Sequence, residues 1–173
     1  FSENPKLQIL RGLTLLSANI CFFYSISIIS MAKALTLAFV APLVTTAMSP
    51  ILLGETVGIK RWTAVIVGFI GSLVVIRPGF IEFNLATIAA LGTGCLYGIY
   101  LIITRKLHTA DNPLLTLLIT GIVGASISTF FVPIVWVNPT NIQWLWLAIM
   151  GIFACLGHLL LIYSLRFADA SKL

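Results

Sequence analysis

The chain has 173 residues, of which 60% are hydrophobic and 9% are charged, and its mean hydropathy is +1.11. Soluble domains carry about 25% charged residues, so the composition argues against a soluble domain, which would lack polar side chains to cover its surface. The net charge of +5 does not indicate a nucleic-acid-binding protein, because the basic residues stand at the ends of apolar stretches without interleaved aromatic residues.

Six apolar stretches follow one another, and each predicts a membrane-spanning helix. They cover residues 12–32, 34–53, 62–76, 85–104, 114–137 and 144–165. Most are about 20 residues long, the length that an α-helix needs to cross about 30 Å of hydrocarbon. The stretch 62–76 is short, and we expect residues 57–59 to extend it while Lys60 and Arg61 reach back to the headgroups. The predicted fold class is an all-α polytopic membrane protein with six transmembrane helices.

The basic residues predict the orientation, because cytoplasmic loops of membrane proteins are rich in Lys and Arg. If six spans alternate in direction, eight basic residues fall on the side of the N-terminus and two on the other. The first set is Lys6, Arg11, Lys60, Arg61, Arg105, Lys106, Arg166 and Lys172, and the second is Lys33 and Arg77. We therefore expect the first side to be cytoplasmic and the protein to be a multi-pass protein of the inner (plasma) membrane.

One short pattern occurs twice, 139 residues apart. The matching pairs are Tyr24 and Tyr163, Ser25 and Ser164, and Lys33 and Lys172. The two copies fall on opposite sides of the membrane in the predicted topology, so the second copy is inverted, with five helices per repeat. Inverted repeats are typical of secondary transporters, whose binding site lies near the midplane between the two halves. The repeat and the absence of an initiator Met lead us to expect that the chain is part of a longer protein.

Several short motifs stand in residues 41–79. They are the pair Pro42 and Leu43, then Gly54 and Glu55, then Arg61 and Trp62 followed by Gly68 and Gly71, and finally Arg77, Pro78 and Gly79. With the ending FADAS at residues 167–171, these motifs resemble the drug/metabolite transporter superfamily of the EamA type. The resemblance implies ten helices in two inverted five-helix repeats. It makes residues 1–84 the end of the first repeat, about helices three to five. Residues 85–173 become the start of the second repeat, about helices six to eight and the connector to helix nine.

Asn19 and His158 are the most informative polar pair inside the spans, because they are also 139 residues apart and lie near mid-span. A polar side chain at that depth is costly unless it faces protein or water. One interpretation is a cavity pair that binds substrate, with His158 also able to titrate near neutral pH. The other is hydrogen bonding between helices, worth about 1 kcal/mol.

Aromatic residues and a proline complete the candidate substrate site. Tyr24 and Tyr163 either contact substrate or form an interfacial belt. Tyr97 and Tyr100 share one helix face, which either lines the cavity or packs in the core. Pro42 is internal to its span, and its kink either frees a carbonyl for the cavity or is passive.

The motif residues Gly54, Glu55, Arg61, Trp62, Arg77, Pro78 and Gly79 are interpreted as structural. Glu55 in particular is expected to form an ion pair or a cap that fixes its connector. Glycines 68, 71, 92, 94 and 98 are expected to permit close helix approach.

The predicted function is secondary-active transport of small metabolites or drugs by alternating access, with the cavity at the repeat interface. The alternative is a structural or sensor membrane protein, while an intramembrane enzyme is disfavoured because the spans hold one His and no carboxylate. Because the spans contain so few charged residues, we expect the site to suit neutral, amphipathic or zwitterionic solutes. The expected partners are a solute and the lipid bilayer, with a homodimer as a further option. Neither a cofactor nor a metal is predicted, since the three cysteines lack metal-site spacing.

Overall fold

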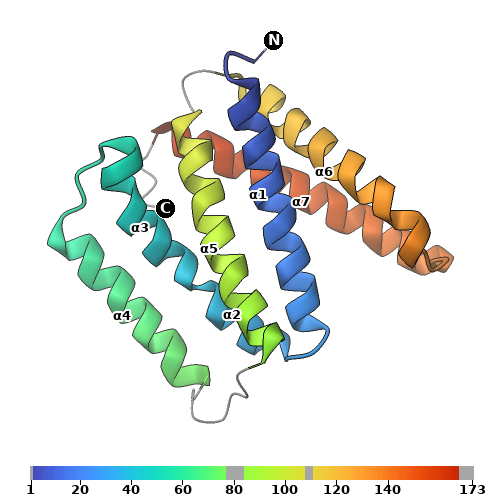
Figure 1. Ribbon diagram of the computed structural model, residues 1–173, viewed down its shortest axis with the longest axis horizontal. Helices are drawn as coiled ribbons and strands as arrows, with labels where there is room; N and C mark the ends of the chain where they lie inside the picture. Colours follow the sequence, from blue (N-terminus) through green and yellow to red (C-terminus); the bar gives the residue numbers. More distant parts are fainter. Residues whose placement is uncertain (1, 77–83, 108–110, 168–173) are drawn as a thin grey trace.

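The computed structural model describes residues 2–76, 84–107 and 111–167, and these residues form a bundle of helices without a strand (Figure 1). In chain order the helices are α1 (Pro5–Ile26), α2 (Met31–Ala38), α3 (Val40–Leu53), α4 (Ile59–Ile76), α5 (Leu85–Lys106), α6 (Pro113–Val135) and α7 (Asn141–Phe167).

Within the described residues, five spans are long and apolar enough to cross a membrane, namely α1, α2 together with α3, α5, α6 and α7. The helix α4 is not among these five, but its 18 residues rise about 27 Å, close to the thickness of the hydrocarbon core. The prediction of an all-helical polytopic membrane protein is therefore confirmed.

The first predicted span was wrong at both ends, and local signals explain why. α1 begins at Pro5 rather than near residue 12, since proline is well suited to the first turn of a helix. It ends at Ile26 rather than at residue 32. Ser30 then caps α2, because its hydroxyl oxygen accepts a hydrogen bond from the Lys33 backbone N–H.

The second predicted span is interrupted at Phe39, between α2 and α3. Pro42 lies in the first turn of α3 and has no N–H to donate to the carbonyl of Ala38. That carbonyl packs against Gly94 of α5 so closely that a Cβ at Gly94 would stand 2.5 Å from its oxygen. The break thus follows from a proline and from the close approach of two helices.

The helix α5 is the centre of the bundle. It packs against α1, α2 and α3, while α4 flanks α2 and α3 on one side and α6 and α7 lie on the other (Figure 1). Glycines allow the closest approaches: Gly12 of α1 faces Val123 of α6, and Gly98 of α5 faces Val44 of α3. A Cβ at Gly68 or Gly71 would meet nothing within 4 Å, so the expected close contacts are not seen there.

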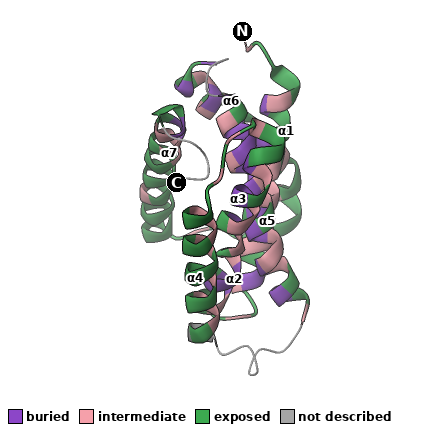
Figure 2. Ribbon diagram, turned by 90° about the vertical axis from the view of Figure 1, so that its left-hand side faces the viewer, coloured by how far each residue is buried: buried purple, intermediate pink, exposed green. Residues whose placement is uncertain are grey.

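Burial is concentrated on the helices around α5, whereas α7 is almost entirely exposed (Figure 2). Its only buried side chains are Ile162 and Leu165, near its C-terminal end. Apolar residues such as Phe153 and Leu160 are more than half exposed. Such surfaces suit contact with lipid or with further helices.

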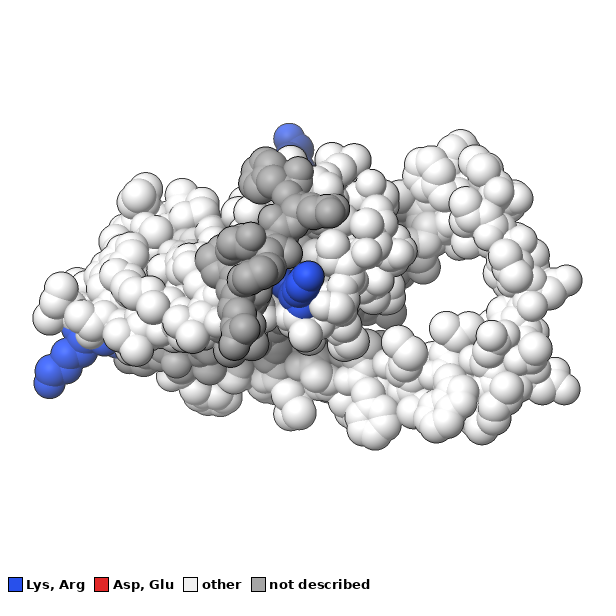
Figure 3. Space-filling model, turned by 90° about the horizontal axis from the view of Figure 1, so that it is seen from below, with Lys and Arg blue, Asp and Glu red and all other residues white. Residues whose placement is uncertain are grey.

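The ends of the bundle differ in charge. The start of α1 and the ends of α3, α5 and α7 lie at one end of the bundle (Figure 1). The face seen from the opposite end shows only scattered Lys or Arg side chains, separated by uncharged residues (Figure 3). The fold therefore gathers the predicted cytoplasmic residues of these helices at one end, as a positive-inside membrane protein would.

Candidate functional site

A buried arginine organises the polar groups between α1, α5 and α6. Arg11 of α1 has no exposed surface. Its Nε donates to the Thr104 hydroxyl at 2.7 Å and its Nη2 donates to the Tyr100 hydroxyl at 2.9 Å. Its Nη1 donates to the Thr116 carbonyl at 3.1 Å and also to the Thr120 hydroxyl. A buried charge is tolerated only when such partners surround it.

Tyr100 connects this arginine to the helix α7. The guanidinium carbon of Arg11 lies 4.7 Å from the Tyr100 ring centroid, within the range of a cation–π contact. The Tyr100 hydroxyl oxygen is 3.2 Å from Nδ1 of His158. Because arginine can only donate, the Tyr100 oxygen accepts from Arg11, and its own O–H is available to donate to Nδ1. In the neutral tautomer that accepts this bond, the ring proton of His158 lies on Nε2.

A second polar group extends the cluster toward the start of α1. Gln8 donates through Nε2 to the Asp111 carboxylate at 2.7 Å and to the Thr116 hydroxyl at 3.0 Å. The Ser2 hydroxyl and the Glu3 backbone N–H also donate to Asp111, at 2.5 and 3.1 Å. Burial raises the pKa of the Asp111 carboxyl, but these hydrogen bonds outweigh it and hold the pKa below its usual value.

The charge of Arg11 is not neutralised by its described surroundings. Every acceptor named above for Arg11 is a hydroxyl or a backbone carbonyl. Among residues 2–76, 84–107 and 111–167, no carboxylate oxygen lies within 4.0 Å of it. Asp111 contacts Gln8 instead, and Glu55 pairs with Arg105. No described carboxylate therefore contacts Arg11 directly, and Asp111 reaches it only through Gln8 and Thr116.

A cavity of about 250 Å³ lies beside this cluster, among α1, α5, α6 and α7. Its polar lining comes from Asn19, Tyr100, Thr120 and His158, and Cys155 also contributes. Asn19 and His158, the pair 139 residues apart, thus face the same space from α1 and α7. The remaining lining is apolar or glycine, which leaves these few polar groups to orient a ligand.

A larger hollow of about 690 Å³ lies on the other side of α5, against α2, α3 and α4. Pro42 and Tyr97 line it, together with Thr45 and Arg61. Tyr97 stacks on Tyr100 with ring centroids 5.5 Å apart, so this aromatic pair stands between the two spaces.

The structure does not bring all the predicted substrate residues together. Pro42 and Tyr97 line the larger hollow, whereas Asn19, Tyr100 and His158 line the smaller cavity. Tyr24 and Tyr163 line neither space, and their side chains are 41% and 40% exposed.

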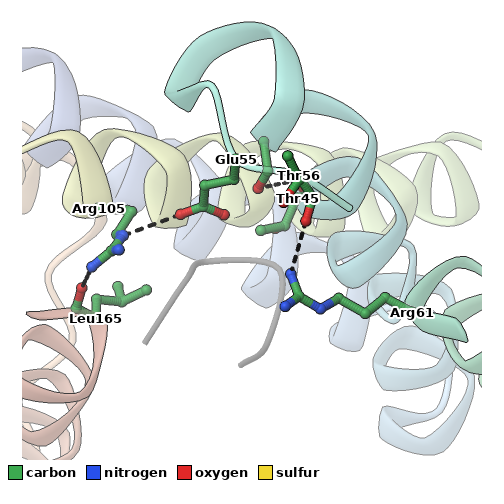
Figure 4. Close-up of polar contacts among 7 residues, drawn as sticks. Thr45, Glu55, Thr56, Arg61, Arg105 and Leu165 are labelled. Atoms are coloured by element: carbon green, nitrogen blue, oxygen red, sulfur yellow. Dashed lines mark hydrogen bonds and ion pairs between the residues drawn. The ribbon is translucent and has the colours of Figure 1, made fainter. Parts of the chain in front are cut away.

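The motif residues hold the ends of three helices together (Figure 4). α3 ends at Gly54, which has a left-handed φ of +68° that disfavours side chains. Glu55 then forms an ion pair with Arg105 of α5, with Oε1 and Nε 3.1 Å apart. Arg105 also donates to the backbone carbonyl of Leu165 in α7.

The rest of the motif lies at the start of α4 or beyond it. Nη1 of Arg61 donates to the Thr56 carbonyl at 3.4 Å, and Trp62 is half-buried. The remaining motif residues, Arg77, Pro78 and Gly79, lie outside the described residues.

Sequence reasoning missed the role of Arg11, which it assigned to the cytoplasmic surface. The signal was nevertheless present at Pro5, since proline marks a helix start and places Arg11 nearly two turns inside α1. The threonines that receive the guanidinium come from α5 and α6 and carry no sequence pattern that points to α1. Within the described part of the chain, no group of three or more His, Cys, Asp or Glu is placed to hold a metal ion.

Comparison with known proteins identifies what the chain resembles. Residues 4–77 match the EamA-like transporter family, which confirms the resemblance predicted from the sequence. The chain is similar to the S-adenosylmethionine uptake transporter of Rickettsia prowazekii (strain Madrid E), with 26% identity over 165 residues, 95% of this chain and 55% of the relative. The transporter of the same name from Rickettsia bellii (strain RML369-C) is 27% identical over 170 residues, 98% of this chain and 58% of the relative.

The chain is also similar to a relative that is named for a different solute. The riboflavin transporter of Vibrio cholerae serotype O1 (strain ATCC 39315 / El Tor Inaba N16961) is 28% identical over 141 residues, 80% of this chain and 47% of the relative. The chain thus spans roughly half the length of these curated relatives. No solved structure matches it.

Proposed function

We propose that this chain, whose residues 4–77 match the EamA-like transporter family, forms part of a secondary-active carrier that moves small metabolites across the inner (plasma) membrane. The observation that carries the proposal is the small cavity among α1, α5, α6 and α7. Asn19, Tyr100 and His158 present polar groups to it from three membrane-spanning helices. Polar groups at such depth serve a substrate pathway more readily than they serve stability.

The placement of the cavity suits alternating access. α1 belongs to the proposed first repeat and α5, α6 and α7 to the proposed second, so the cavity lies where the two repeats meet. α1 packs extensively on α5, whereas α7 has few neighbours. A shift of α7 against the other helices would open the cavity while leaving the central bundle intact.

The proposed chemistry is binding and conformational exchange without bond cleavage. An intramembrane hydrolase would need an acid, a base or a metal site grouped within the spans. The described spans offer His158 and no carboxylate beside the cavity. The curated relatives are named for two different solutes, S-adenosylmethionine and riboflavin, and both are test solutes for this protein.

Transport by purified protein tests the proposal. The intact protein is reconstituted into proteoliposomes, and the uptake of labelled S-adenosylmethionine and riboflavin is measured. Asn19→Leu and His158→Leu should abolish uptake while membrane insertion persists, because leucine is well tolerated in lipid. Thr129→Leu is the control, since Thr129 is an exposed residue of α6 outside the cavity lining. Normal uptake by both cavity variants would refute the cavity as the transport site.

The same assay addresses the alternative of a structural or sensor protein. That alternative requires that no solute of a broad metabolite panel crosses the membrane. His158→Gln separates proton coupling from binding, because glutamine retains hydrogen bonding but does not titrate. An unchanged pH profile of uptake in His158→Gln would remove His158 as a proton carrier.

A further inference from the structure

The neutral surroundings of Arg11 have a consequence for the kind of solute that the cavity accepts. The guanidinium is fully buried in a membrane-spanning helix, and its described acceptors are hydroxyls and one backbone carbonyl. Hydrogen bonds satisfy its donors but do not cancel its charge. In a medium of low dielectric constant that charge acts over a longer range than it would in water.

Two of the residues that accept hydrogen bonds from Arg11 also line the cavity. Tyr100 and Thr120 both accept from Arg11 and both line the cavity. Thr120 also donates to the Thr116 carbonyl at 2.8 Å, so its one proton is already used. The Tyr100 hydroxyl oxygen also lies 3.2 Å from Nδ1 of His158. Because Tyr100 is fully buried in this structure, a ligand oxygen has to displace the imidazole in order to accept the Tyr100 proton.

The other polar groups at the cavity can also donate. Neutral His158 carries an Nε2–H in the tautomer whose Nδ1 accepts from Tyr100, and the amide of Asn19 has two N–H bonds. No carboxylate side chain among the described residues lines the cavity. Donors beside a guanidinium that no described carboxylate contacts form an environment that suits a carboxylate group.

We propose that the cavity among α1, α5, α6 and α7 receives a singly charged carboxylate group of the transported solute, with Arg11 balancing its charge through Tyr100. This inference rests on the proposed carrier function and names its substrate class. The volume of about 250 Å³ suits a small carboxylate or the carboxylate end of a larger solute. One arginine balances one negative charge, so a monocarboxylate or the acid group of a zwitterion fits better than a dianion.

Cys155 provides a reporter of binding that does not depend on transport, because it lines the same cavity. Every other cysteine of the intact protein is replaced by alanine, and the rate of alkylation by N-ethylmaleimide is measured in membranes. Benzoate and benzamide are the probes, since they share a shape and differ in charge. Benzoate should protect Cys155 at a roughly tenfold lower concentration than benzamide. A matched protein that retains only Cys95, which does not line this cavity, should show no such difference.

Charge variants test the part played by Arg11. Thr120→Asp places a carboxylate where a hydroxyl now accepts from Arg11, and it should remove the preference for benzoate. Thr120→Asn is the neutral control of similar size and should retain the preference. Arg11→Gln should also remove it, and if that variant does not fold, the Thr120 pair still decides the question.

The outcomes separate this inference from the proposed function. Equal protection by benzoate and benzamide, or an undiminished preference in Thr120→Asp, would overturn the carboxylate site. Uptake of S-adenosylmethionine or riboflavin together with equal protection would leave the carrier standing and refute the inference alone. Selective benzoate protection without uptake of any solute would support the anion site and refute the carrier.

Discussion

The Tyr100 hydroxyl is the group whose removal best tests the polar cluster. Tyr100→Phe keeps the ring that packs against Arg11 and Tyr97 and deletes only the oxygen. The guanidinium then loses its Nη2 acceptor at 2.9 Å and His158 loses its partner at 3.2 Å. Because the tyrosine is fully buried, water does not readily replace the lost oxygen.

The expected cost follows from the charge of the donor. A hydrogen bond to a charged group is worth about 1.5–3 kcal/mol, and an average hydrogen bond between membrane helices about 0.6 kcal/mol. We take about 2 kcal/mol for Tyr100→Phe, since the stranded donor is charged and buried. In a protein of this size, that loss lowers the melting temperature by about 4–8 °C.

The assay is thermal unfolding of the intact protein in detergent. Tyr163→Phe is the control, because Tyr163 is 40% exposed and none of the hydrogen bonds described here involves its hydroxyl. The control should melt within about 1 °C of the parent protein. A Tyr100→Phe variant that melts together with the control would refute the view that Tyr100 satisfies a buried charge.

Three further predictions concern packing, pH and topology. Gly94→Ala should destabilise the bundle by about 1–3 kcal/mol in thermal unfolding, because the new Cβ would stand 2.5 Å from a backbone carbonyl oxygen, whereas Gly121→Ala, with nothing within 4 Å, should not. The pKa of the Asp111 carboxyl is lower in the folded protein than in the unfolded chain, so ionisation of Asp111 stabilises the fold. This stability is fully present above the unfolded pKa of about 3.9 and is lost as the pH falls through the lower folded pKa. Asp111→Asn should therefore reduce the fall in melting temperature on acidification. A single cysteine in place of Lys33 should react with an impermeant thiol reagent from outside the cell, and one in place of Lys60 should not; the reverse order would refute the orientation.

The all-helical, membrane-spanning class could be predicted from the sequence, because lipid imposes a simple rule on length and polarity. Of the six predicted spans, the described residues give five that are long and apolar enough to cross a membrane. The ends of the helices were harder to predict. The turn at 27–30 holds two isoleucines beside two serines, so hydropathy does not clearly mark the end of α1 there. The capping oxygen of Ser30 sets the start of α2 instead. One capping hydrogen bond thus sets a helix boundary that composition does not predict.

The candidate site was predictable only in part. Asn19 and His158 stood out because a polar side chain is rare in an apolar span, and both line one cavity. Arg11 did not stand out, because a basic residue near a span end is the usual sign of a cytoplasmic loop. Its burial depends on hydroxyls of Thr104 in α5 and Thr120 in α6, which lie 93 and 109 residues further along the chain. No local pattern encodes such a meeting of distant segments.

The position of Arg11 along α1 links the charge asymmetry to the proposed anion site. Without Arg11 the predicted charge tally is seven against two, so the orientation still follows. Arg11 lies about 9 Å along α1 from Pro5, and Asn19 lies about 12 Å further. In the predicted orientation, the positive end of the cavity is therefore nearest the cytoplasm. A carboxylate arriving from outside meets the neutral amide of Asn19 before it reaches Arg11, whereas one arriving from the cytoplasm meets the charge first. The electrostatic attraction of Arg11 for an anion is therefore stronger at the cytoplasmic end of the cavity than at the outer end. A carrier that uses this cavity has to overcome a different attraction when it releases the anion to each side of the membrane.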